Sequence, residues 1–129
     1  AGTPFCATCP DRVLGSRVGP GVASGTTVGQ SDDTRPSCRG GTASDLAFGW
    51  TAPATGRFTF DTIGSSFDTV LYLLSSCGGA ELPGACDDDS GGGTTSSITL
   101  PLNAGQSIVI VVDGFGTAEG SYILNIAQI

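Results

Sequence analysis

The sequence predicts an all-β protein, an antiparallel β-sandwich of the jelly-roll type with about eight strands. Three observations favour this fold. Short apolar runs alternate with polar residues, clusters of Gly, Asp and Ser separate these runs, and no stretch combines helical periodicity with a cap. The 129 residues suffice for one domain with a modest core. The runs recur at about the interval expected of strands in a sandwich.

The first three strands are expected at residues 46–50, 58–60 and 70–74. In the first two, apolar side chains occupy every second position, which is the pattern of a strand with one buried face. Residues 70–74 read VLYLL and are apolar throughout. A continuous run of this kind indicates a central strand that is covered on both faces.

Three further strands are expected toward the C-terminus. Residues 98–102 alternate and contain Pro101, which places this strand at a sheet edge or at its own end. Residues 108–112 are β-branched throughout and indicate a second central strand. Residues 122–126 place three apolar side chains on one face of the last strand.

The chain divides at about residue 44. Residues 1–44 are rich in Gly, Pro, Ser, Thr and Arg and show little periodicity. We interpret them as a Cys-containing arm that adds one or two strands, around residues 13–18 and 22–28. Residues 45–129 are the predicted core sandwich.

Composition excludes several classes of partner. The net charge is −7, with only five basic residues, so clustered positive charge for nucleic acid or an anionic membrane surface is missing. The longest apolar stretch, residues 108–112, is too short to span a bilayer. The chain has no Met. Its natural N-terminus is therefore expected to have been removed, either by a signal peptidase or by excision from a longer protein.

The sequence also argues against catalysis. Ser, Thr and Cys nucleophiles need an activating base, most often His, and the chain has no His. Lys is absent as well, which excludes Ser–Lys dyads and Schiff bases. Two opposed carboxylates would serve a glycosidase, but a sandwich of this size has little room for the cleft they need. We therefore expect no enzymatic activity.

An ordered series of motifs identifies a family resemblance. The motifs are DLAFGWTAP (45–53), GRFTFDT (56–62), SFDTVLYL (66–73), CGG (77–79), CDDD (86–89), AGQ (104–106), VVDGF (111–115) and GSYILNI (120–126). The series resembles the bacterial pre-peptidase C-terminal domain, a relative of the collagen-binding domains of clostridial collagenases. The resemblance implies a jelly-roll sandwich, an extracellular setting and a non-catalytic binding role, sometimes with Ca²⁺.

Two departures limit what this resemblance carries over. No peptidase is part of this chain, and the Cys-rich segment 6–38 lies outside the family pattern. Collagen binding depends on surface aromatics that cannot be placed in this sequence. That specific activity is therefore not transferred.

Five cysteines indicate an oxidising compartment. Cys77 and Cys86 bracket a short connection between two predicted strands, and a disulfide there would contribute about 2–3 kcal/mol. We expect Cys6 or Cys9 to pair with Cys38. The odd count leaves one cysteine as a free thiol, as a bond to a part outside this chain or as a link between chains.

An acidic run follows Cys86 and is a candidate Ca²⁺ site, since Ca²⁺ takes six to eight oxygen ligands. A solvated acidic turn is the alternative interpretation. Asp68 has a further structural interpretation, because its carboxylate can accept backbone N–H bonds and fix the turn before a strand. The candidate ligands are Asp87, Asp88, Asp89, Asp68 and Asp45, with Asp113 as a possible addition.

Aromatic residues divide between the core and the surface. Trp50 follows the apolar alternation, so we expect it in the core. Tyr72 and Tyr122 are expected to be more exposed. Phe115 stands between two glycines on a predicted loop and is the best candidate for an exposed contact aromatic.

Two functions follow from these expectations. The first is a secreted, non-catalytic adhesion or assembly module that binds an extracellular protein or polysaccharide, with Ca²⁺ as a candidate cofactor. The second is a self-assembling subunit of an extracellular filament. In that case the N-terminal arm would add a strand to a neighbouring copy, and the odd cysteine would form an intermolecular disulfide.

Overall fold

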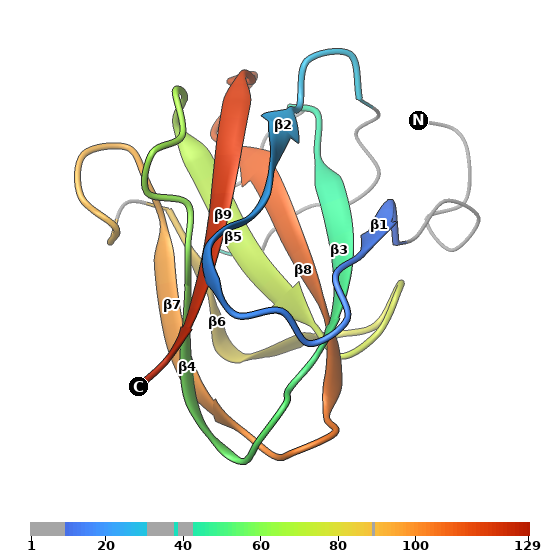
Figure 1. The fold of residues 1–129 in the computed structure, drawn as a ribbon. Coiled ribbons are helices and arrows are strands. Elements are labelled where there is room, and N and C mark those ends of the chain that lie inside the picture. The colour runs from blue at the N-terminus through green and yellow to red at the C-terminus, as the bar shows by residue number, and fades with distance from the viewer. Residues whose placement is uncertain (1–9, 31–37, 39–42, 89) are drawn as a thin grey trace.

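The computed structural model describes residues 10–30, 38, 43–88 and 90–129, and these residues form two packed β-sheets (Figure 1). Within them there are nine strands and no helix, so none of them forms an apolar helix that could cross a membrane. The predicted all-β sandwich is confirmed. The strands are β1 (Arg12–Val13), β2 (Gly19–Thr26), β3 (Leu46–Thr51), β4 (Gly56–Asp61), β5 (Thr69–Leu74), β6 (Glu81–Asp87), β7 (Ser97–Leu102), β8 (Ser107–Gly114) and β9 (Ser121–Gln128).

The five-stranded sheet has the order β1-β3-β8-β5-β6, and the four-stranded sheet has the order β2-β9-β4-β7. All neighbouring pairs are antiparallel except β1 with β3, which is parallel. The predicted antiparallel arrangement is confirmed for every other pair, and this two-residue pair is an addition from the N-terminal segment. The order also shows that residues 108–112 of β8, which are apolar throughout, belong to a central strand between β3 and β5.

Strand β6 is the main difference from the expected strands, because its residues were interpreted as a connection. Its sequence, ELPGACD, lacks alternation and contains Pro83 and Gly84. It is an edge strand that pairs only with β5, and the pairing register shifts between Tyr72 and Leu74. Edge strands tolerate Pro because one side of their backbone needs no sheet partner.

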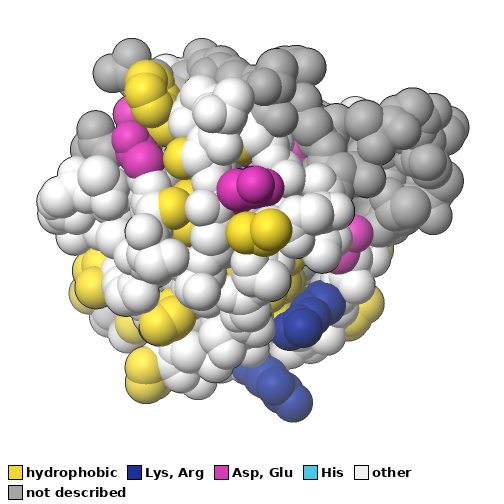
Figure 2. Space-filling view, turned by 90° about the horizontal axis from the view of Figure 1, so that it is seen from above, with side chains coloured by type: hydrophobic (Ala, Val, Ile, Leu, Met, Phe, Trp, Pro, Cys, Tyr) yellow, Lys and Arg dark blue, Asp and Glu magenta, His cyan; other side chains and the backbone are white. Residues whose placement is uncertain are grey.

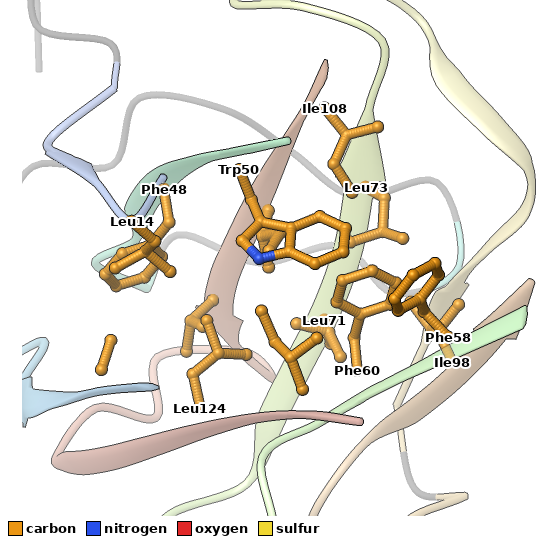
Figure 3. Close-up of a cluster of buried hydrophobic side chains, with 14 of the residues drawn as sticks. Leu14, Phe48, Trp50, Phe58, Phe60, Leu71, Leu73, Ile98, Ile108 and Leu124 are labelled. Carbon is orange, nitrogen blue, oxygen red and sulfur yellow. The ribbon is translucent and has the colours of Figure 1, made fainter. Parts of the chain in front are cut away.

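The main core lies between the sheets and centres on Trp50 (Figure 3). The rings of Phe58 and Phe60 meet Trp50 edge-on, with centroid distances of 5.3 and 5.2 Å. Such aromatic pairs add to the stabilisation from burial alone. Trp50 Nε1 donates a hydrogen bond of 2.7 Å to the Arg17 carbonyl, which ties the N-terminal segment to this core. The expected core position of Trp50 is confirmed.

A second apolar cluster covers the outer face of the five-stranded sheet. Cys77 and Cys86 pack against it, and no member is more than 6% exposed. Both faces of β5 and β8 are therefore buried, as their continuous apolar sequences predicted. Tyr72 belongs to this cluster, so its expected exposure is wrong. The cluster comprises Ala47, Val70, Tyr72, Leu74, Val109 and Val111.

The N-terminal segment contributes a strand to each sheet. Strand β2 pairs with β9, and β1 pairs with β3. Gly49 permits the close approach of Pro10, because a Cβ at Gly49 would lie 3.3 Å from Pro10 Cγ. The division of the chain at residue 44 remains a prediction about domain organisation.

Candidate functional site

The acidic residues singled out in the sequence lie near one end of the sandwich, where β6 leads into β7. The Asp87 carboxylate accepts hydrogen bonds from Ser90 N (2.9 Å), Ser90 Oγ (2.7 Å) and Ser97 N (2.9 Å). These bonds close the β6–β7 connection in the manner of an Asx turn. Asp87 therefore has a structural role, whatever else its oxygens bind.

The other candidate ligands occupy separate positions around this end. Asp45 is buried directly before β3, and the Asp68 carbonyl accepts the N–H of Phe115 at 2.9 Å. The Asp88 carbonyl accepts the Ser96 hydroxyl at 2.6 Å, and Asp89 lies outside the described residues. In the part of the chain that the structure describes, no three acidic or Cys side chains are grouped to hold a metal ion. Calcium binding remains a prediction.

Asp113 is a buried acid near the same end, on the outer face of the five-stranded sheet. Its carboxylate accepts hydrogen bonds from the Tyr72 hydroxyl at 3.2 Å and from Gly114 N at 2.7 Å. Only 3% of Asp113 is exposed. Buried carboxylates need such partners. The Tyr72 hydroxyl and the Asp113 carboxylate are therefore hydrogen-bond partners beside the outer apolar cluster.

A buried network of hydroxyl groups joins three strands beside the acidic connection. Thr62 and Thr69 share a hydrogen bond of 2.6 Å between their hydroxyls, and Thr69 shares another of 3.0 Å with the Ser96 hydroxyl. Ser96 N donates to Thr62 Oγ1 at 2.9 Å, and all three residues are fully buried. The chain supplies no imidazole or amine base to activate these hydroxyls. The network is structural, and the sequence analysis did not find it.

The disulfide pairing differs from the expected one. Cys86 is bonded to Cys38, 48 residues earlier, with a Cα–Cα distance of 5.7 Å. The expected Cys77–Cys86 disulfide is therefore wrong, as is the pairing of Cys38 with Cys6 or Cys9. Cys77 is disulfide-bonded too, and its partner lies outside the described residues, as Cys6 and Cys9 do. The physical reason is that β6 lies at the sheet edge and presents Cys86 beside Tyr72 on the outer face.

Phe115 lies in the turn between β8 and β9 and is 43% exposed. Its N–H donates to Asp68 O, and its carbonyl accepts Ala118 N at 3.0 Å, so the turn is held at both ends. The expected exposure is confirmed, whereas a contact role for this ring stays a prediction. Tyr122, in contrast, is only 1% exposed, and its expected exposure is wrong.

A polar pocket of about 480 Å³ opens where an edge of each sheet meets the N-terminal segment. The sequence analysis missed this pocket because its residues come from segments far apart in the chain, on β1, β2, β3 and β9. The basic residue Arg12, within the arm, was the available signal. The lining residues are Asp11, Arg12, Gly25, Thr26, Gln30, Leu46 and Tyr122.

Neither the protein-family models nor the curated proteins contain a match to this sequence. Among solved structures, the chain is similar to the pre-peptidase C-terminal domain of collagenase from Bacillus anthracis, a crystal structure at 1.0 Å. The alignment covers 89% of this chain and 92% of that one, with a TM-score of 0.56 and 11% sequence identity. At this identity the similarity concerns the fold. It confirms the fold that the sequence resemblance implied.

Proposed function

We propose that this chain is a secreted, non-catalytic module for adhesion or structural assembly outside the cell. The observation that carries the proposal is the sandwich cross-linked by the Cys38–Cys86 disulfide, with a fold similar to the pre-peptidase C-terminal domain of a collagenase. Disulfides persist in oxidising compartments, which supports an extracellular location. Fold similarity alone does not assign function, so the site chemistry must support the proposal too.

The site chemistry supports a binding role over a catalytic one. The sequence has no His or Lys to activate a nucleophile. The hydroxyls of Thr62, Thr69 and Ser96 bond to one another in the interior. Asp87 and Asp113, which a carboxylate-based mechanism would need free, each accept two or more hydrogen bonds from neighbouring groups.

The test is retention outside the cell. The oxidised, labelled domain is incubated with intact bacteria and with their isolated extracellular material, and bound protein is measured against a matched-size β-sandwich of similar net charge. We expect saturable retention of the domain and no turnover of protein or glycan substrates. Equal retention of the control would overturn the adhesion role, and turnover that tracks the pure protein would overturn the non-catalytic role.

Calcium is a separate proposal that deepens this function. Since the described acids form no group of three, a Ca²⁺ site would require Asp89 or main-chain oxygens in addition to Asp87 and Asp88. A ligand that binds only the folded state raises the unfolding temperature. We expect a higher Tm in millimolar Ca²⁺ than in chelator, and Mg²⁺ at the same concentration serves as the control. An unchanged Tm would remove calcium from the proposal.

The filament alternative has less support from the contacts of the N-terminal segment. Strand β2 is already paired with β9 of the same chain, and Arg17 is bound to Trp50. Strand β2 is therefore not a free arm, although its other edge has no partner among the described strands. The odd cysteine count still permits a covalent link between copies. Non-reducing electrophoresis separates the two functions, because only the filament subunit forms a ladder of cross-linked species.

A further inference from the structure

The pocket beside Arg12 has a floor formed by a buried tyrosine. The Tyr122 ring lies in the core, 5.6 Å from the Phe48 ring between centroids. Its cross-strand neighbour on β2 is Gly25, and a Cβ at that position would lie 3.3 Å from the Tyr122 hydroxyl oxygen. The missing side chain leaves the hydroxyl end of Tyr122 at the pocket surface.

Three polar groups of this pocket have no hydrogen-bond or ion-pair partner among the described residues. No described residue forms an ion pair or side-chain hydrogen bond with the Arg12 guanidinium. None bonds to the Tyr122 hydroxyl or to the Gln30 side-chain amide. Arg12 and Gln30 are exposed, so water can solvate their polar groups, whereas Tyr122 is only 1% exposed and a buried hydroxyl normally has a partner. A pocket with a few convergent polar groups is the usual form of a small-molecule site. The Tyr122 hydroxyl, in a pocket that also contains Arg12, therefore points to a ligand that supplies its missing hydrogen bond.

The sign of the ligand's charge is inferred from Arg12 alone. The chain carries a net charge of −7, so an anion is repelled by most of its surface and would bind only beside an available basic group. In Figure 2 the basic side chains lie together at one edge of the view, whereas acidic side chains are spread over the rest. The Asp11 carboxylate, also in the pocket, accepts the Ala47 N–H at 2.8 Å. The Arg12 guanidinium has no ion-pair partner among the described residues, and we expect it to bind an external carboxylate in bidentate geometry.

The Tyr122 hydroxyl is suited to donate to such a carboxylate. Burial raises the pKa of Tyr122 above its ordinary value of 10.0, Arg12 lowers this pKa and Asp11 raises it. The net direction is upward, so the hydroxyl keeps its proton at neutral pH. It can then act as a donor alongside the guanidinium.

The contacts at the pocket rim disfavour a peptide strand as the occupant. A peptide that extends the five-stranded sheet would have to pair with its edge strand β1, which offers only two residues. At Ala47 both groups are taken, because Asp11 N donates to the Ala47 carbonyl and the Ala47 N–H donates to the Asp11 carboxylate. The remaining lining offers hydroxyl, amide and guanidinium groups, which match the hydroxyls of a sugar.

We propose that this pocket binds a carboxylate-bearing saccharide, with Arg12 and Tyr122 on the carboxylate and with Gln30 on the sugar hydroxyls. The pocket volume of about 480 Å³ lies within the range of ~300–1,000 Å³ that is typical of ligand pockets. This inference rests on the proposed adhesion function and names the class of ligand for it.

The test is calorimetric titration of the folded domain with trigalacturonate and with its methyl ester, which keeps the shape but removes the charge. We expect binding of the acid, at least tenfold weaker binding of the ester, and weaker binding at high salt. Arg12→Gln should reduce affinity for the acid at least tenfold. Arg57→Gln, an exposed arginine on β4, is the matched control and should leave the affinity unchanged.

Several results would overturn this assignment: no binding of the acid, equal binding of the ester, or equal losses in the two arginine variants. Binding of a tripeptide through its free C-terminal carboxylate at the same affinity would show that the ligand class is wrong. The adhesion function is judged separately by the retention assay. Undiminished retention of the Arg12→Gln variant would show that the pocket is not the adhesion site, while the adhesion function itself would stand.

Discussion

Removal of the Cys38–Cys86 disulfide should lower the free energy of unfolding by about 4 kcal/mol. The bond joins positions 48 residues apart, and the chain-entropy model gives that magnitude for a loop of this length. The expected Cys77–Cys86 bond would have closed a much shorter loop and contributed about 2–3 kcal/mol on the same model. The observed pairing therefore constrains the unfolded chain more strongly than the one expected from the sequence.

The assay is urea unfolding of the Cys38→Ala/Cys86→Ala double variant beside the oxidised wild-type chain. Changing both residues avoids a new free thiol. We expect a lower midpoint and a steeper dependence on urea, because an unfolded chain without this cross-link exposes more surface. A single Ser76→Ala substitution, on the neighbouring turn, serves as the matched surface control. A loss below about 1 kcal/mol with an unchanged slope would refute the loop-closure reasoning.

Three further predictions concern the core and the pocket. Thr69→Val should lower the free energy of unfolding by about 1–3 kcal/mol, measured by urea titration, because it removes the hydroxyl that is hydrogen-bonded to the buried hydroxyls of Thr62 and Ser96. Gly114→Ala should reduce the yield of folded protein severely, measured by soluble expression and circular dichroism, because a Cβ there would overlap the Ala118 carbonyl; a normal yield would contradict this packing. Stability should fall as pH rises above about 10, since the raised pKa of Tyr122 favours the neutral hydroxyl in the folded state. Tyr122→Phe should flatten this alkaline loss in thermal melts.

The strands of the core could be predicted from the local pattern of apolar residues, because a strand buried on one face alternates and a strand buried on both faces is apolar throughout. The alternation in residues 46–50 and the continuous apolar run in residues 70–74 correspond to β3 and β5. Strand β6 could not be predicted in this way. Its Pro83 and Gly84 are tolerated only because the strand is at an edge, and edge position is a property of the whole sheet.

The candidate site was less predictable than the fold. The exposure of Phe115 followed from its glycine neighbours, which mark a turn. The burial of Tyr72 and Tyr122 did not follow, because it depends on what covers the outer face and on how β2 pairs with β9. The hydroxyl network likewise joins Thr62 to Ser96, 34 positions apart, and no local pattern indicates such a contact.

The sequence by itself determined the all-β class and the positions of the apolar strands. Only the tertiary structure decided the partner of Cys86, the edge strand β6 and the pocket around Arg12 and Tyr122. The physical reason is the distance along the chain over which each interaction acts. The period of side-chain burial is set by neighbouring residues along one strand, whereas pairing across the sheets is set by the packing of the whole sandwich.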